Sequence, residues 1–157
     1  MIDMSQWKIP LYRIYTDDED EKIVNKVIRR GNTWAIGPEI EEFENNLREF
    51  VGMKHCVTVN SGTSALHAAL LAYGIGNGDE VIVPSFSFIS TANSVIFVQA
   101  KPVFADIEEQ NYGLDPQSIS NKITKNTKAV MPMDYAGQSC KIFEIKEVIQ
   151  DQNILLI

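Results

Sequence analysis

The sequence predicts an α/β fold in which helices cover a mostly parallel β-sheet. From residue 55 onward, strand, turn and helix patterns alternate along the chain, which is typical of layered α/β domains. The strand candidates at 81–83 and 154–157 are apolar without interruption, as expected for strands that are buried on both faces of a parallel sheet. With 157 residues and 45% apolar residues, the chain is long enough to form one such domain.

Two helices are predicted before the alternating part begins. Residues 1–16 show no regular period and are expected to form an N-terminal arm. Residues 17–30 begin with acidic and end with basic side chains, an order that suits the helix dipole. A second helix is predicted over 38–52, because proline opens it, glycine closes it and its apolar residues form one stripe. We therefore expect an arm followed by a larger domain over 17–157.

The alternating part supplies the elements of the sheet and its helices. Strands are expected at 55–59, 80–83, 102–106, 128–132 and 153–157. Helices are expected at roughly 62–73, 88–98, 116–123 and 142–150. Right-handed crossovers would then place ligand-binding groups just past the carboxyl ends of the strands. Because the chain stops at Ile157, inside the last predicted strand, the sequence is interpreted as a fragment.

Composition and charge exclude several functional classes. The net charge of -7 argues against general binding to nucleic acid or to an anionic membrane. No apolar run approaches the ~18 residues that cross a bilayer, and the start MIDMSQWKIP is unlike a secretory signal. Cys56 and Cys140 lack CxxC spacing, which favours a reduced, cytoplasmic setting. His55 and His67 have no partners at ligand spacing, so no metal site is expected.

The stretch VTVNSGTSAL places a small polar turn between a predicted strand and a predicted helix. Gly62 would let the backbone approach a ligand closely, and the first amides of the helix have no acceptors within it. With the hydroxyls of Thr63 and Ser64, this turn could bind a phosphate group. The alternative is that Ser61 or Asn60 only caps the helix.

A second strand end carries two aromatic residues in the stretch VPSFSFIST. Phe86 or Phe88 could stack on a planar ring near a phosphate held at 62–64. The alternative is that both phenyl rings fill the core beneath the next helix.

Taken together and in order, these stretches resemble the DegT/DnrJ/EryC1/StrS family of pyridoxal-phosphate-dependent sugar aminotransferases. The resemblance rests on GPEIEEFENNLREF, NSGTSALHAALLAYGIGNGDEVIVPSFSF, AKPVFADIE and MDYAGQ, and it covers residues 9–157. It implies a three-layer α/β/α large domain of the aspartate-aminotransferase fold type (fold type I). It also implies pyridoxal 5'-phosphate as cofactor.

The resemblance also implies roles for individual residues. Gly62, Thr63 and Ser64 would bind the cofactor phosphate, and Phe88 would stack on the pyridine ring while Phe86 serves packing.

Two further residues would contact the substrate by the same resemblance. Trp34, in the glycine-rich loop, would lie on the sugar-binding side, and Tyr135 would face substrate or the dimer partner. The substrates would be glutamate and a nucleotide-linked keto sugar, in amino-sugar biosynthesis for cell-surface polysaccharide or secondary metabolites. A homodimer is implied as well.

One residue that the chemistry of the family needs is expected beyond the last residue of this sequence. The Schiff-base lysine would come after Ile157, so no catalytic residue is assigned and the 157-residue chain alone is expected to be inactive. Lys125 matches a Ser-x4-Lys spacing but precedes the wrong strand, and it is interpreted as a solvated surface lysine. The alternatives are a lysine-less family member with a binding or regulatory role, and a pyridoxal-phosphate-dependent sugar 3-dehydratase.

Overall fold

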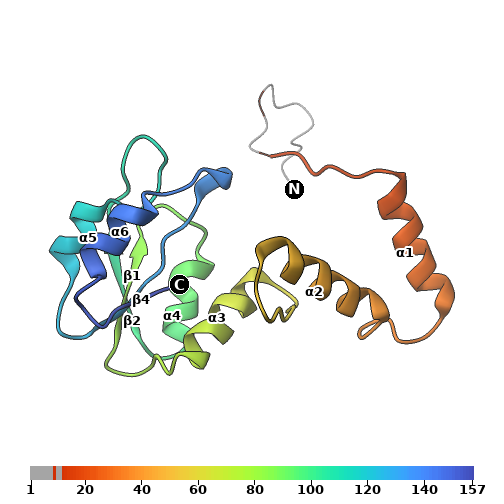
Figure 1. The fold of residues 1–157 in the computed structure, drawn as a ribbon, viewed down its shortest axis with the longest axis horizontal. Coiled ribbons are helices and arrows are strands. Elements are labelled where there is room, and N and C mark those ends of the chain that lie inside the picture. The colour runs from red at the N-terminus through yellow and green to blue at the C-terminus, as the bar shows by residue number, and fades with distance from the viewer. Residues whose placement is uncertain (1–8, 10–11) are drawn as a thin grey trace. The chain divides into compact units, whose positions relative to one another are not determined.

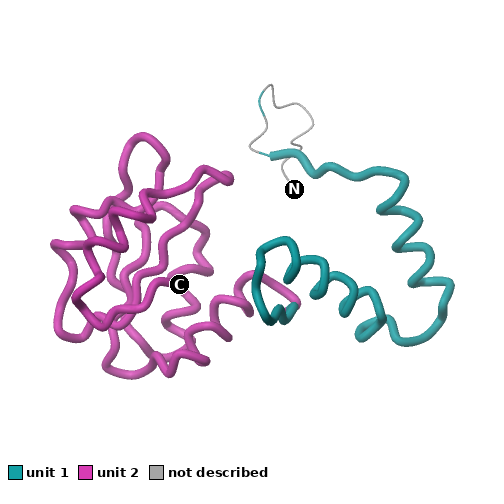
Figure 2. Tube along the Cα trace, in the orientation of Figure 1, with its two compact units in different colours: residues 1–58 teal, residues 59–157 magenta. Residues whose placement is uncertain are grey.

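The structure is a computed structural model that describes residue 9 and residues 12–157. It divides into two compact units, residues 1–58 and residues 59–157 (Figure 2). Most of the predicted N-terminal arm lies outside the described residues, and residues 12–17 have neither helical nor strand structure. The single domain predicted over 17–157 stays a prediction.

Unit 1 contains two helices that begin and end as their sequences predict. Helix α1 (Asp18–Arg30) opens with a capping box, in which the Asp17 carboxylate accepts hydrogen bonds from the N–H groups of Glu19 and Asp20. Helix α2 (Pro38–Val51) opens with its proline and closes at Gly52, whose positive φ of 69° suits glycine. Neither helix contains a buried residue, so local capping rather than a core defines both.

Unit 2 is built on a four-stranded parallel sheet with the strand order β2-β1-β3-β4. The strands are β1 (Glu80–Pro84), β2 (Lys101–Ala105), β3 (Thr127–Val130) and β4 (Leu155–Leu156). The helices are α3 (Gly62–Ala72), α4 (Ser90–Phe97), α5 (Pro116–Lys122) and α6 (Ile142–Ile149). Apart from the first predicted strand, each predicted element of this part is found, with ends that shift by a few residues.

The helices of unit 2 cover both faces of the sheet. In β1, Val81 and Val83 point into a core with α3 and α4, whereas Ile82 between them points into a second core with α5 and α6. Figure 1 shows the same division, with α5 and α6 on one side of the strands and α3 and α4 on the other. The predicted three-layer α/β/α architecture is therefore confirmed.

The strand predicted at 55–59 is wrong. This segment forms no β-ladder with any described residue, and the Val57 side chain is 80% exposed. The backbone N–H and the hydroxyl of Thr58 instead donate to the Glu44 carboxylate of α2, at 2.7 and 2.9 Å. An apolar run becomes a strand only when a neighbouring strand accepts its backbone hydrogen bonds, and here a side chain does so.

The carboxylate of Glu80, at the start of β1, links β2 and the segment before β3 at the amino edge of the sheet. Glu80 is 7% exposed, and it accepts hydrogen bonds from Nζ of Lys101 at 2.8 Å and from the Thr124 hydroxyl at 2.6 Å. These two bonds, led by the one from Lys101, hold the pKa of Glu80 below its ordinary value of 4.5 against the opposing effect of burial.

Glu80→Gln is expected to remove a pH-dependent contribution to stability. A carboxyl whose pKa is lower in the folded state stabilises the fold above its unfolded-state pKa, and this contribution is lost as pH falls through the folded-state pKa. The stability difference between the native protein and Glu80→Gln should therefore be full at pH 7 and should shrink below about pH 4.5. Urea unfolding of both proteins from pH 7 to pH 3 measures it; a difference that stays constant with pH would contradict the assignment.

No helix among the described residues is long and apolar enough to cross a membrane.

Candidate functional site

The sheet of unit 2 has a point where the strand order reverses, between β1 and β3. The helix after β1, α4, packs on one face of the sheet, and the helix after β3, α6, packs on the other. The loops that leave these two neighbouring strands therefore diverge at the carboxyl edge, where parallel α/β sheets bind their ligands. The candidate site lies at this edge.

Helix α3 begins near the carboxyl edge of the sheet. At the opposite end, a β-carbon on Gly76 would lie 3.6 Å from the carbonyl oxygen of Val98, so the turns that follow α3 and α4 meet there. Mid-helix His67 contacts Phe97 near the end of α4, with ring centroids 5.7 Å apart. Because α4 starts at the carboxyl edge and runs alongside α3, the first residues of α3 point toward that edge too.

The first turn of α3 is organised by three polar side chains. Ser61 is the N-cap, and its hydroxyl oxygen accepts from the Ser64 N–H at 3.1 Å. The Ser64 hydroxyl donates to the Asn60 side-chain oxygen at 2.8 Å and accepts from the Ser61 hydroxyl at 3.0 Å. Ser61 therefore caps the helix, and the interpretation that capping is its only role stays a prediction. The cap leaves the N–H groups of Gly62 and Thr63 without acceptors within the helix.

Gly62 is exposed and meets no neighbour where a side chain would stand. A β-carbon built there has nothing within 4 Å, and its φ lies outside the left-handed region. Packing and backbone conformation therefore do not demand glycine at this position. A ligand that approaches the N–H groups closely would demand it, and a phosphate at a helix N-terminus is such a ligand.

Ser61→Ala and Thr63→Ala are expected to separate capping from ligand binding. Ser61→Ala removes the cap and should lower the free energy of unfolding by about 1 kcal/mol, with little change in affinity for a phosphate ligand. Thr63→Ala should leave stability nearly unchanged and weaken that affinity. Thermal unfolding and titration with pyridoxal phosphate measure the two effects. If both variants lost stability and affinity in the same proportion, residues 62–64 would have no binding role separate from the cap.

The two phenylalanines after β1 differ in their surroundings. Phe88 precedes α4 and its side chain is 72% exposed, so it is free to stack on a ligand ring. Phe86 contacts Tyr135 and Tyr112, with centroid distances of 4.7 and 6.1 Å. Neither phenyl ring is buried beneath α4, so the alternative in which both fill the core is wrong.

Tyr135 and Tyr112 complete an aromatic cluster at the carboxyl edge. Tyr135 is half-buried at the start of the 3-10 turn η2 (Tyr135–Gly137), which follows β3. Tyr112 comes from the loop after β2, where it adopts a positive φ of 57°, and its ring lies 6.2 Å from that of Tyr135. Sequence reasoning missed Tyr112, because no local pattern indicates that the loops after three different strands meet.

Trp34 lies in unit 1, on the loop between α1 and α2, and its side chain is 66% exposed. Within unit 2 the structure brings Phe86 and Tyr135 into contact, and the start of α3 lies at the same edge of the sheet. Trp34 belongs to the other unit.

Cys140 is a structural residue beside the site. Its N–H donates to the Asp134 carboxylate at 2.9 Å, which ties down the loop that carries Tyr135. Burial, and then the nearby Asp134 carboxylate, raise the pKa of the Cys140 thiol to about 11. The thiol is therefore protonated near pH 7 and is not a nucleophile.

Comparison with known proteins decides the family. Residues 15–157 match the DegT/DnrJ/EryC1/StrS aminotransferase family. The chain belongs to this family. The family membership and the fold class inferred from the sequence are confirmed.

Two curated relatives of the DegT/DnrJ/EryC1/StrS family illustrate the similarity. The chain is 38% identical over 149 residues to a GDP-perosamine synthase of Vibrio cholerae, covering 95% of this chain and 41% of the relative. It is 39% identical over 140 residues to a UDP-2-acetamido-2-deoxy-3-oxo-D-glucuronate aminotransferase of Pseudomonas aeruginosa, covering 89% of this chain and 39% of the relative. The chain thus spans about two fifths of the length of these relatives.

A solved structure connects the family to its cofactor. The structure of NtdA from Bacillus subtilis with bound cofactor PMP is 32% identical and superposes with a TM-score of 0.80 over 90% of this chain and 33% of that one. Pyridoxal phosphate, of which PMP is the aminated form, is confirmed as the cofactor of the DegT/DnrJ/EryC1/StrS family. The site has features that fit this cofactor: N–H groups at the start of α3 without acceptors in the helix, open space at Gly62 and an exposed Phe88 ring.

Proposed function

We propose that this chain forms the phosphate-binding part of an enzyme that transfers an amino group from glutamate to a nucleotide-linked keto sugar. The observation that carries the proposal is the open first turn of α3 at Gly62, on the same edge of the sheet as Phe88. Family membership supports aminotransferase chemistry, and the names of both curated relatives support a nucleotide-linked sugar.

The residues of this site would hold the cofactor by its two ends. The N–H groups of Gly62 and Thr63 would donate to the phosphate at the positive end of the helix dipole, and the Thr63 hydroxyl would add a donor. Ser64 would donate only after its hydroxyl turns away from Asn60. Phe88 would lie flat against the pyridine ring and keep water from that face. When bound, pyridoxal phosphate supplies an electron sink for the carbanion formed during amino transfer.

Neither a proton-transfer residue nor a Schiff-base residue is assigned to this chain. Lys125 lies in the turn between α5 and β3, at the amino edge of the sheet and opposite the candidate site, which supports its interpretation as a surface residue. The proposal therefore assigns the Schiff-base lysine to a position outside these 157 residues, and it expects the isolated chain to bind cofactor without transferring amino groups. The proposal also states that the complete protein forms a homodimer.

The test uses the protein expressed from its complete coding sequence. Glutamate should convert bound pyridoxal phosphate to its aminated form, and a UDP- or GDP-linked keto sugar should then gain an amino group, detected by mass spectrometry. Light scattering measures the molar mass of the protein and so tests whether it is a dimer. A protein that binds cofactor but transfers no amino group from glutamate would overturn the proposal, and removal of the C3 hydroxyl instead would identify a sugar 3-dehydratase.

A further inference from the structure

Three aromatic rings join the loops that follow β1, β2 and β3 at the carboxyl edge of the sheet. Phe86, in the loop after β1, lies against Tyr135, in the loop after β3, with ring centroids 4.7 Å apart. Tyr112, in the loop after β2, lies 6.1 Å from Phe86 and 6.2 Å from Tyr135. Because the loops after β1 and β3 diverge where the strand order reverses, this aromatic cluster connects two loops that the sheet itself directs apart.

The loops after β2 and β3 are also joined by close backbone packing and a hydrogen bond. Gly113 is buried against Cys140, and a β-carbon on Gly113 would lie 2.6 Å from the Cys140 β-carbon, so only glycine fits there. The side-chain amide of Asn111 donates to the carbonyl of Ser139 at 3.1 Å. Tyr112 stands between these two contacts in the sequence, so its backbone is fixed on both sides.

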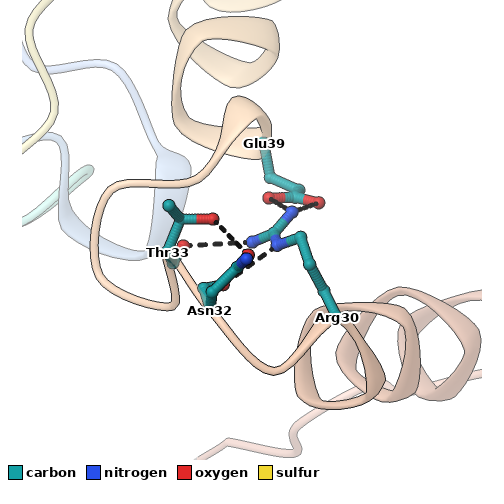
Figure 3. A network of polar contacts seen from close by, with 4 residues as sticks. All are labelled: Arg30, Asn32, Thr33 and Glu39. Carbon is teal, nitrogen blue, oxygen red and sulfur yellow. Dashed lines mark hydrogen bonds and ion pairs between the residues drawn. The ribbon is translucent and has the colours of Figure 1, made fainter.

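The backbone around the aromatic cluster is strained. Among the described residues, four non-glycine residues have a left-handed φ: Thr33, Gln99, Tyr112 and Ala136. Gln99 lies directly after helix α4, where this conformation stops a helix. The Thr33 carbonyl accepts from Arg30, which also donates to Glu39 (Figure 3). The other two lie in the loops after β2 and β3, within or next to the aromatic cluster. Strained backbone persists only where surrounding contacts hold it, and it is frequent at ligand-binding sites.

The aromatic cluster lies outside both hydrophobic cores of unit 2. Phe86 and Tyr112 are 44% and 52% exposed, and none of the three rings belongs to the core on either face of the sheet. The cluster therefore connects loops and does not fill the interior. Phe88, two residues after Phe86, carries its exposed ring on the same loop, at the edge where α3 begins. Contacts that fix Phe86 thus restrict the loop that presents Phe88.

We propose that Tyr112 is a positioning residue for the cofactor: through Phe86 it holds the loop over residues 85–89 in the conformation that binds the pyridine ring. The inference rests on the proposed function, in which Phe88 contacts this ring. The phosphate and the ring are then held by different parts of the site, the phosphate by the start of α3 and the ring by a loop that the aromatic cluster fixes. A loop fixed before binding loses little conformational entropy when the ligand arrives. Loss of the Tyr112 ring should therefore weaken the contacts to the pyridine ring and spare those to the phosphate.

The first experiment follows the loop without any ligand. Limited digestion with chymotrypsin, which cuts after aromatic residues, should cleave residues 85–89 about fivefold faster in Tyr112→Ala than in the parent, because a mobile loop enters a protease more readily. The protein comes from the complete coding sequence, and mass spectrometry identifies the cut. Tyr112→Phe keeps the ring and should restore the parent rate. Tyr73→Ala removes the same side chain from a 58% exposed position at the other end of α3, and should leave the rate unchanged.

The second experiment separates positioning from general damage by comparing three ligands. Tyr112→Ala should weaken binding of pyridoxal phosphate about tenfold, and should weaken binding of pyridoxal, which lacks the phosphate, by a similar factor. Inorganic phosphate, measured by calorimetry, should bind Tyr112→Ala as it binds the parent. Tyr112→Phe should restore both lost affinities, and Tyr73→Ala should have the parent values for all three ligands. If Tyr112→Ala does not fold, Tyr112→Leu takes its place, because it keeps apolar bulk without an aromatic ring.

The outcomes distinguish this inference from the proposed function. Equal losses for pyridoxal phosphate, pyridoxal and inorganic phosphate, or no loss for any of them, would overturn the inference and leave the aminotransferase assignment intact. An unchanged rate of cleavage at 85–89, or a failure of Tyr112→Phe to restore binding, would also overturn it. If the parent binds pyridoxal phosphate but transfers no amino group, the proposed function fails, and the cleavage rates and the three affinities still decide the inference. A parent that does not bind pyridoxal phosphate would overturn both.

Discussion

Gly62→Val is expected to weaken pyridoxal phosphate binding by about a hundredfold, equivalent to ~3 kcal/mol. The valine side chain would enter open space at the first turn of α3, where a β-carbon has no neighbour within 4 Å, so the fold should tolerate it. The same side chain would occupy the place through which a phosphate reaches the N–H groups of Gly62 and Thr63. Absorbance titration of the protein from the complete coding sequence measures the affinity.

Two controls show whether the loss concerns the phosphate. Ala68→Val adds the same β-branched residue to an exposed position of α3, more than a turn farther from its start, and should leave affinity unchanged. Pyridoxal, which lacks the phosphate, should bind the parent and Gly62→Val about equally. If Gly62→Val bound pyridoxal phosphate as the parent does, residues 62–64 would not be the phosphate site.

Ile82→Ala is expected to lower the free energy of unfolding of unit 2 by about 3 kcal/mol. Ile82 lies in the middle of β1 with no exposed surface, and it packs in the core between the sheet and helices α5 and α6. Its removal leaves a cavity that rigid parallel strands fill only partly. Urea unfolding followed by circular dichroism measures the change.

An exposed residue of the same sheet provides the control for this substitution. Lys128→Ala, in the adjacent strand β3, should change stability by less than about 0.5 kcal/mol. Hydrogen exchange at the amides of 81–83 assigns the loss to unit 2. If Ile82→Ala and Lys128→Ala had equal effects, the two-sided core described here would be incorrect.

Several features of this protein could be predicted from local sequence. The ends of both helices of unit 1 could be predicted from Asp17, Pro38 and Gly52, because caps and left-handed stops depend on neighbouring residues. The continuous apolar run at 81–83 predicted a strand buried on both faces of a parallel sheet, because such a pattern is also local. Gly62 and the residues that follow it predicted an anion-binding helix start, and the structure adds that the turn is open.

The features that could not be predicted depend on contacts between residues far apart in the sequence. The run at 55–59 has the composition of a strand, but Glu44 takes the hydrogen bond from the Thr58 N–H that a neighbouring strand would accept. Tyr112 joins Phe86 and Tyr135 only because three loops meet at one edge of the sheet.

The sequence by itself determined the family, the order of helices and strands from residue 62 onward, and the residue types at the turn 61–64, because these depend on short patterns. Only the tertiary structure decided which faces pack together, where the strand order reverses, and that Arg30 reaches Glu39 across a loop. The physical reason is that strand pairing, side-chain burial and ion pairs between elements depend on distances in space, which no local period of the sequence specifies.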